Sequence, residues 1–345
     1  MIRRAIKVFE ADLTDLTVLT EAGSRYFVFT PLIAALAGAK EVLVFCRDSR
    51  YGSRQDILAN LRAWAAILGI ADRIVPITER SDTRIGQADI VTNLGFVRPI
   101  DAELIGMLGT TAAIPLMWET WEYRPQDLDL TLARERNIPV LGTNESDPRL
   151  RTMEYVGVAA LKALLNCGIE ALGSHVLIVG SGAFAQACRD VMARIGAVVT
   201  LVDSRDADYG QQATREVIGQ DVVIVAEHLS RRCLLGSDGL DLSQIVPSQR
   251  PSLIVHVAGE VERLHCERYG VPTYPETVAS NGYMSLATDT VGPKPVIDLH
   301  TAGLVVGASM SLNARRGLRG IEAEWATLAA LPFAQGFSDR HEARI

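Results

Sequence analysis

A glycine-rich loop directly follows a run of apolar residues in the second half of the chain. The run covers residues 175–179, the loop is Gly180-Ser181-Gly182-Ala183-Phe184-Ala185, and a helical pattern follows. In this context the first glycine makes a tight turn, the second lets the backbone approach a pyrophosphate, and the third small residue lets helix and strand pack closely. Free N–H groups and the positive end of the helix dipole would hold the phosphates. The loop therefore predicts a dinucleotide-binding Rossmann domain.

An acidic residue stands where such a domain recognises the adenosine ribose. Asp203 ends the next predicted strand, and a carboxylate at this position accepts hydrogen bonds from the ribose hydroxyls. A carboxylate there also repels the additional phosphate of NADP. We therefore predict NAD as the cofactor. NADP is the less favoured alternative, and it stays open because the adjacent pair Ser204-Arg205 places an arginine beside the ribose, where it could accept that phosphate. The ends of two further strands are predicted to line the same site with Ala226, Glu227, His228, His256 and Ala258.

A histidine near the carboxyl end of the chain is the predicted proton carrier. His300 follows a predicted strand at residues 296–299 and precedes Gly303 and a helical pattern. An unperturbed imidazole titrates near neutral pH, so it can give or take the proton that accompanies hydride transfer. Two alternatives stay open: His300 bonds a backbone group or caps a helix, or else His228 or His256 is the acid.

Two loops in the first half of the chain are the candidates for substrate recognition. Each follows a predicted strand, and loops at the carboxyl ends of parallel strands face the ligand. The first loop supplies Asn93, Gly95 and Arg98. The second, residues 118–124, concentrates aromatic and charged side chains, with Trp118, Glu119, Glu122 and Arg124 among them. Arg98 or Arg124 would bind a carboxylate, and Glu119 or Glu122 an amine. An inter-domain or dimer contact is the alternative for residues 118–124.

Apolar β-branched runs alternate with helical patterns along the chain, which predicts an α/β fold with two doubly wound parallel-sheet domains. Strands are expected at residues 6–9, 41–45, 73–76, 90–93, 113–117, 139–142, 175–179, 198–203, 222–226, 253–257 and 296–299. Helices are expected around residues 29–37, 55–68, 102–108, 128–136, 148–167 and 302–331.

The same pattern predicts the domain limits. Residues 1–147 form a substrate-binding domain of flavodoxin-like type, and residues 148–300 form the NAD-binding domain with a linker helix. Residues 301–345 form a helix that packs back across the domain junction, with a frayed polar tail from Gln335 onward.

The composition narrows the class of partner. A formal net charge of −7 and a pI near 5.5 provide no broad positive field, which disfavours nucleic acid and anionic membranes. The five cysteines are scattered, and neither they nor the histidines have metal-ligand spacing. No signal peptide and no membrane-spanning run is recognisable. We expect a cytoplasmic protein without metal whose partner is a small molecule.

Three stretches together resemble the NAD-dependent D-2-hydroxyacid dehydrogenases, in their broad formate and glycerate dehydrogenase-like superfamily. They are residues 127–140, the glycine loop, and His300-Thr301-Ala302-Gly303, which is similar to the catalytic His-x-x-Gly of the family. The resemblance implies an NAD-dependent oxidoreductase that transfers hydride to or from a small polar substrate in an inter-domain cleft, and a homodimer. It also implies that His300 is catalytic and that Glu276 orients it.

The chain departs from the family at one position and thereby leaves other functions open. Where the family has a substrate-binding arginine, this sequence has Ala258-Gly259-Glu260. The substrate class therefore ranges from hydroxy or keto acids to amino or imino compounds. Residues 255–260 are also loosely similar to a loop of S-adenosylhomocysteine hydrolases, so a hydrolase or lyase with tightly bound NAD is one alternative. An NAD-binding protein without catalysis is the other.

Overall fold

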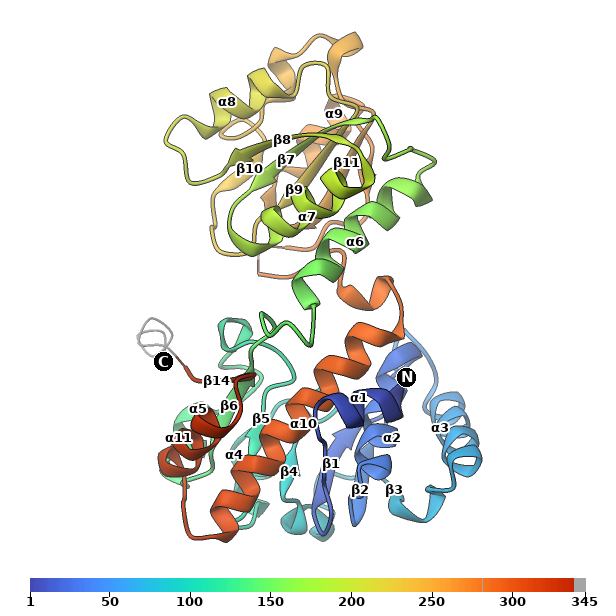
Figure 1. The fold of residues 1–345 in the computed structure, drawn as a ribbon, viewed down its shortest axis with the longest axis vertical. Coiled ribbons are helices and arrows are strands. Elements are labelled where there is room, and N and C mark those ends of the chain that lie inside the picture. Colours follow the sequence, from blue (N-terminus) through green and yellow to red (C-terminus); the bar gives the residue numbers. More distant parts are fainter. Residues whose placement is uncertain (281, 338–345) are drawn as a thin grey trace. The chain divides into compact units, whose positions relative to one another are not determined.

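The computed structural model describes residues 1–280 and 282–337, and the chain folds as two compact units. The first unit combines Met1–Leu150 with Pro293–Ile345, and the second is Arg151–Gly292 (Figure 1). Both units are α/β with parallel sheets, so the predicted fold class is confirmed. Residues 293–300, expected at the end of the NAD-binding domain, belong instead to the first unit.

A parallel sheet forms the centre of the first unit. Four strands pair in the order β3-β2-β1-β4, and a parallel bridge between Ile90 and Ala113 continues the sheet into β5 and β6. The short β14 closes the edge antiparallel to β6. The strands are β1 (Thr17–Glu21), β2 (Glu41–Phe45), β3 (Ile74–Ile77), β4 (Ile90–Val91), β5 (Ile114–Pro115), β6 (Val140–Thr143) and β14 (Ala334–Gln335).

This strand order corrects the flavodoxin-like expectation. A flavodoxin-like sheet runs 2-1-3-4-5, whereas this sheet runs 3-2-1-4-5-6, the order of a dinucleotide-type doubly wound fold. The switch point, where the order reverses, lies between β1 and β4. Ligands bind outside the carboxyl ends of the strands at such a point. Glu21 ends β1 and Asn93 follows β4 by two residues, so both belong to this edge.

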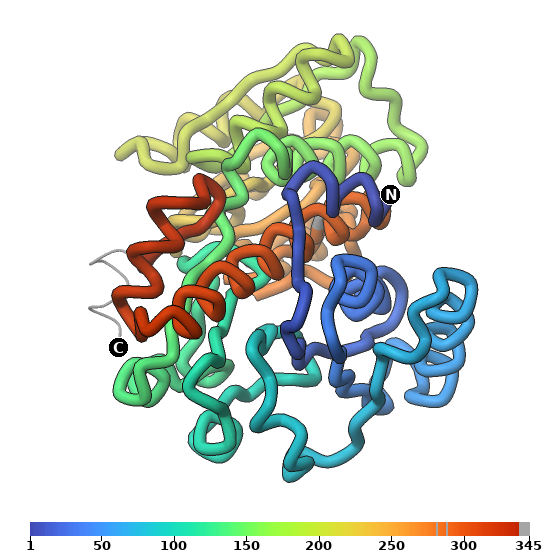
Figure 2. Tube along the Cα trace, turned by 60° about the horizontal axis from the view of Figure 1, so that its bottom comes forward, coloured from blue at the N-terminus to red at the C-terminus, as the bar shows by residue number. Residues whose placement is uncertain are grey.

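Helices cover the sheet of the first unit, and the longest of them, α10, lies against β4, β5 and β6 (Figure 1). Helix α1 packs beside α10, as Figure 2 also shows. The helices are α1 (Ile2–Val8), α2 (Phe29–Leu36), α3 (Arg54–Leu68), α4 (Ala102–Met107), α5 (Leu130–Glu135), α10 (Pro293–Arg315) and α11 (Ile321–Ala330).

Three sequence expectations in this unit are wrong. Residues 6–9 and 296–299, expected as strands, lie in or directly after α1 and within α10. The long helical pattern at 302–331 is two helices, because the chain turns at Gly317 and Gly320, which have positive φ. The tail was expected to fray from Gln335, but Gln335 lies in β14, and residues 338–345 are outside the described residues.

Among the described residues, one helix has the length and apolar composition that could cross a membrane. It is α10, and most of its apolar stretch is buried inside the structure. Leu304, Val306 and Met310 are all fully buried. Packing against the sheet therefore accounts for the apolar character of α10.

A five-stranded parallel sheet in the order β13-β11-β9-β7-β8 forms the second unit. Its switch point lies between β7 and β9. Both strands are buried along nearly their whole length. The elements of this unit are α6 (Thr152–Asn166), β7 (His175–Gly180), α7 (Gly182–Ile195), β8 (Val198–Asp203), α8 (Tyr209–Glu216), β9 (Val222–Ala226), β10 (Cys233–Leu235), β11 (Leu253–Ala258), β12 (Glu260–Val261), α9 (Arg263–Arg268) and β13 (Thr273–Tyr274).

Candidate functional site

The glycine loop connects β7 to α7 at the switch point of the second unit. Gly180 has a φ of +148° and Gly182 a φ of +66°, which favour glycine. A Cβ on Gly180 would stand 2.1 Å from the carbonyl oxygen of Ala226 in β9, so this position has no room for a side chain. Gly182 is exposed and begins α7. Strand, turn and helix thus have the geometry that the sequence predicted.

The first backbone amides of α7 are available to an anion. Ser181 occupies the N-cap position, but its side chain accepts no hydrogen bond from the helix. Within the described part of the chain, the exposed Gly182 and Ala183 donate their N–H groups to no protein acceptor. Free amides at the positive end of a helix dipole favour phosphate. These residues therefore fit a pyrophosphate.

Asp203 ends β8, where the ribose was expected. Its carboxylate accepts hydrogen bonds from the backbone N–H and the Nε of Arg205, each at 2.9 Å. The Arg205 side chain lowers the pKa of Asp203. Because the Arg205 side chain is 70% exposed, it can leave the carboxylate without disturbing the core. Asp203 therefore fits a ribose that approaches from solvent.

Glu227 and His228 follow β9, on the other side of the switch point. Glu227 is 1% exposed and hydrogen-bonds to protein groups around it. The His228 ring stacks on Phe184, with 4.1 Å between ring centroids and 18° between planes. Burial lowers the pKa of His228. His228 therefore lies against Phe184 of the glycine loop, and the contact of these residues with a cofactor stays a prediction.

The structure corrects the expectation for His256 and assigns Ala258 a backbone role. His256 lies inside β11 and is fully buried, with Nδ1 2.7 Å from the Ser285 hydroxyl and Nε2 2.9 Å from the Gly259 carbonyl. Both ring nitrogens are occupied, so His256 fixes the chain after β11 and is not available to a ligand. The buried Ala258 accepts a backbone hydrogen bond from Glu227.

A carboxylate and an arginine meet at the switch point of the first unit. Glu21 is 6% exposed, and its Oε2 accepts a hydrogen bond of 2.5 Å from the backbone N–H of Phe96. Burial raises the pKa of Glu21. An added Cβ at Gly95 would lie 3.2 Å from Glu21 Oε2 and 3.8 Å from Arg98 Nη2. Glu21, Gly95 and Arg98 are therefore neighbours, and Asn93 at the same edge accepts a hydrogen bond from Met117.

Arg98 extends from this edge toward the second predicted loop. Its guanidinium lies over the Trp118 ring, 5.2 Å from the centroid, and its Nη1 donates to Asp127 at 2.7 Å. Arg98 Nε and Trp118 Nε1 are both buried without a hydrogen-bond partner among the described residues. Arg124 approaches Asp127 at 3.8 Å. Both predicted arginines therefore approach the Asp127 carboxylate, and Trp118 packs against one of them, Arg98.

The second loop also gathers carboxylates. Glu119 is 9% exposed and accepts hydrogen bonds from Trp121 Nε1 at 2.7 Å and from the backbone N–H of Glu145 at 3.2 Å. Burial raises the pKa of Glu122 to about 7, with Arg124 opposing and the charge of Glu119 reinforcing the shift. Burial and the charges of Glu122 and Glu119 also raise the pKa of Glu145. Glu119, Glu122 and Glu145 therefore form a group of like charges, which we call the carboxylate group.

His300 lies in α10, not in a loop after a strand. Its Nδ1 is 2.7 Å from the Thr30 hydroxyl of α2, and its ring packs against Phe27 with 5.9 Å between centroids. Burial lowers the pKa of His300 to about 4, so the imidazole is neutral at physiological pH. Its Nε2 has no hydrogen-bond partner among the described residues. Glu276, expected to orient His300, is an exposed residue of the second unit, and its role stays a prediction.

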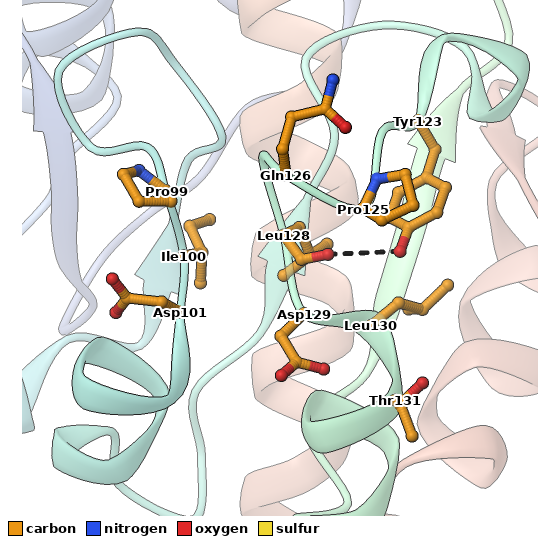
Figure 3. Close-up of a pocket in the computed structure, with 10 residues that line it drawn as sticks. All are labelled: Pro99, Ile100, Asp101, Tyr123, Pro125, Gln126, Leu128, Asp129, Leu130 and Thr131. Atoms are coloured by element: carbon orange, nitrogen blue, oxygen red, sulfur yellow. Dashed lines mark hydrogen bonds between the residues drawn. The ribbon is translucent and has the colours of Figure 1, made fainter. Parts of the chain in front are cut away.

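A pocket of about 370 Å³ lies beside these loops in the first unit, between residues 99–101 and 123–131 (Figure 3). Three of its polar lining groups, those of Tyr123, Asp101 and Asp129, already have partners. The Tyr123 hydroxyl donates to the Leu128 carbonyl, and Asp101 and Asp129 cap α4 and α5 by accepting backbone hydrogen bonds. This pocket therefore offers little to a polar substrate.

Sequence reasoning missed four residues of these sites. Glu145 follows β6 by two residues, a position that could have identified it, whereas Glu21 ends β1, a strand that the sequence pattern did not predict. Thr30, 270 residues from His300, and Asp127, 29 residues from Arg98, gave no such signal, because only the fold brings each beside its partner.

Comparison with known proteins yields matches in structure alone. Neither a protein-family model nor a curated protein matches the chain. One dipicolinate synthase subunit, from Bacillus halodurans, aligns over 84% of this chain and 96% of its own, with 12% identity and a TM-score of 0.54. Its counterpart from Bacillus subtilis aligns over 89% and 98%, with 13% identity and a TM-score of 0.52. The chain has the fold of these two proteins.

Dehydrogenases are also among the similar structures, as the sequence resemblance predicted. NAD+-bound 3-phosphoglycerate dehydrogenase from Entamoeba histolytica aligns over 87% of this chain and 96% of its own, with 13% identity and a TM-score of 0.44. The two dipicolinate synthase subunits have TM-scores above 0.5, and their similarity to this chain is a similarity of fold. A shared fold does not by itself define a function.

Proposed function

We propose that the chain is an NAD-dependent oxidoreductase acting on a small polar substrate. The observation that carries this proposal is the glycine loop with free amides at Gly182 and Ala183, followed by Asp203 at the end of the next strand. The amides bind the pyrophosphate, and Asp203 accepts from the adenosine ribose and repels an additional phosphate. The bound cofactor supplies the hydride acceptor or donor.

His300 handles the proton in this proposal. An imidazole with a pKa of about 4 is neutral at physiological pH, so it acts as a base rather than as an acid. The Thr30 hydroxyl fixes the ring through Nδ1 and leaves Nε2 for the substrate. In an oxidation the proton would move from the substrate to this neutral imidazole.

The carboxylate group favours a substrate that carries a protonated amine. Glu122 and Glu145 have raised pKa values because burial and neighbouring negative charges disfavour their ionised forms. A bound substrate cation would stabilise the ionised forms of these carboxyl groups, and this attraction would contribute free energy to binding. Arg98 would bind a carboxylate of the same substrate. Oxidation would then transfer a hydride from the carbon that bears the amine and a proton to His300, leaving an iminium group.

Two measurements test the proposal. The first is a titration of the wild-type protein with NADH, in which saturable binding is expected. The second incubates the protein with NAD+ and matched pairs of amino acids and 2-hydroxy acids, and follows the absorbance of reduced nicotinamide. Formation of NADH with the amino compounds supports the full proposal. NADH formation with the hydroxy acids alone would contradict the substrate class, and absence of NADH binding would contradict the cofactor.

A further inference from the structure

Glu227 is a buried carboxylate that joins three loops around the predicted cofactor site. Its Oε2 accepts from the Ser181 hydroxyl of the glycine loop at 2.6 Å and from the Ser204 hydroxyl of the loop after β8. Its Oε1 accepts from the backbone N–H groups of Leu229 at 2.7 Å and Ser230 at 3.0 Å. Four donors thus meet a side chain that has roughly four acceptor positions, and Glu227 has none left for a ligand.

The bond to Ser181 keeps the start of α7 open. A serine at an N-cap normally accepts a hydrogen bond from an amide of the first helical turn. A carboxylate only accepts, so the Ser181 hydroxyl must point its proton at Glu227. The Ser181 hydroxyl is held at Glu227 Oε2 and makes no cap hydrogen bond to α7, and the amides of Gly182 and Ala183 stay available.

The bond to Ser204 acts at the other end of the site. Ser204 directly follows Asp203, where a hydroxyl would be well placed to donate to a 2′-phosphate on the ribose. The Ser204 hydroxyl instead donates its hydrogen bond to Glu227, and Ser204 is buried, at 1% exposure. The negative charge of Glu227 behind Ser204 further disfavours a phosphate dianion.

We propose that Glu227 is a positioning residue that sets both the affinity for the dinucleotide and the choice of NAD over NADP. It keeps the α7 amides free for the pyrophosphate by holding Ser181, and it withholds Ser204 from a 2′-phosphate. This inference rests on the proposed function, since it assumes that a nicotinamide dinucleotide binds at the glycine loop.

The test is a set of NADH and NADPH titrations of the full-length protein by calorimetry. Glu227→Gln keeps the volume of the side chain, but its amide nitrogen cannot accept from the serines or the backbone. NADH is expected to bind about tenfold more weakly, and the ratio of NADPH to NADH affinity is expected to rise about tenfold. In the double variant Glu227→Gln/Ser204→Ala the gain in this ratio should disappear, because the freed hydroxyl is its source.

Asp221→Asn is the matched control, since Asp221 precedes β9 at the end opposite Glu227 and accepts from the backbone N–H of His175. It should leave both affinities within about twofold of wild type. Nucleotide affinities in Glu227→Gln that equal those of the wild type and of Asp221→Asn would overturn the inference while leaving the proposed function intact. Absence of binding to the wild type would overturn both.

Ser204→Ala alone supplies a second test that does not depend on the folding of Glu227→Gln. Because Ser204 is turned away from the ribose, its removal should leave the ratio of NADPH to NADH affinity within about twofold of wild type. A fall in relative NADPH affinity of more than about fivefold would show that the hydroxyl already contacts the phosphate, and the inference would be wrong.

Discussion

Replacing Gly182 by alanine separates backbone strain from loss of the phosphate site. Gly182 and Gly270 have nearly the same left-handed backbone, with φ of +66° and +70°. An added Cβ meets nothing within 4 Å at Gly270, but at Gly182 it stands 3.2 Å from His228 and Leu229 side-chain atoms. Left-handed alanine costs about 1 kcal/mol at either position. Both variants should therefore melt about 2–4 °C or more below wild type, and Gly182→Ala should be the lower of the two because its Cβ is crowded.

Affinity for NADH should fall in only one of these two variants. The Cβ of Gly182→Ala occupies the exposed surface at the start of α7, where the backbone must approach the pyrophosphate. We expect a loss of at least about 1.4 kcal/mol, or tenfold in Kd, against no change in Gly270→Ala. Intrinsic fluorescence on addition of NADH, read beside thermal melts, gives both quantities. Equal Kd values in the two variants would refute the placement of the phosphate at this loop.

Three further predictions concern the first unit. Burial lowers the pKa of His300 to about 4, so between pH 6.5 and 4 the unfolded chain binds a proton that the folded chain excludes. The free energy of unfolding should therefore fall by up to about 3 kcal/mol as the pH drops through that window. Unfolding titrations of His300→Gln should lack this component, and a pH dependence equal to that of the wild type would contradict the burial of His300. Thr30→Val removes the partner of His300 Nδ1 and should cost about 1–3 kcal/mol in urea unfolding and reduce turnover, whereas wild-type turnover would show that His300 needs no orientation. Glu122, with a pKa of about 7, ionises between pH 6 and 8, so KM for an amine substrate should fall as the pH rises through 7 in the wild type. The fall should be smaller in Glu122→Gln, where Glu145 still has a raised pKa; parallel profiles would disprove the role of Glu122 in binding.

The sequence predicted the second unit well because its signals are local. A glycine loop between an apolar strand and a helix, with an acid ending the next strand, specifies geometry within a short segment. The ranges predicted for β8 and β9, 198–203 and 222–226, coincide with the observed strands.

The first unit was harder because its strands and helices are decided by packing. Thr17–Glu21 is a central and completely buried strand. Its two threonines and its glutamate interrupt the apolar pattern that is typical of a buried strand. Residues 6–9 and 296–299 are short apolar runs, which fit a strand or a helix equally well. Pro293 is the first residue of α10, and a proline at this position is typical of a helix start.

Side-chain partners distant in sequence could not be predicted at all. Glu227 was expected to contact the cofactor because it follows β9, yet its bonds to Ser181 and Ser204 depend on the spacing of three strand ends. His256 lies in β11 near the same edge of the sheet as other predicted site residues, but its ring is bound to Ser285 of the following chain segment. Such contacts follow only from the assembled sheet.

The most direct test of the account is a calorimetric titration of the purified full-length protein with NADH. The account predicts saturable binding of one nucleotide per chain, tighter than that of NADPH, because free amides at the start of α7 meet the pyrophosphate and Asp203 meets an unphosphorylated ribose. No heat of binding with NADH, in a sample shown by thermal melting to be folded, would contradict it.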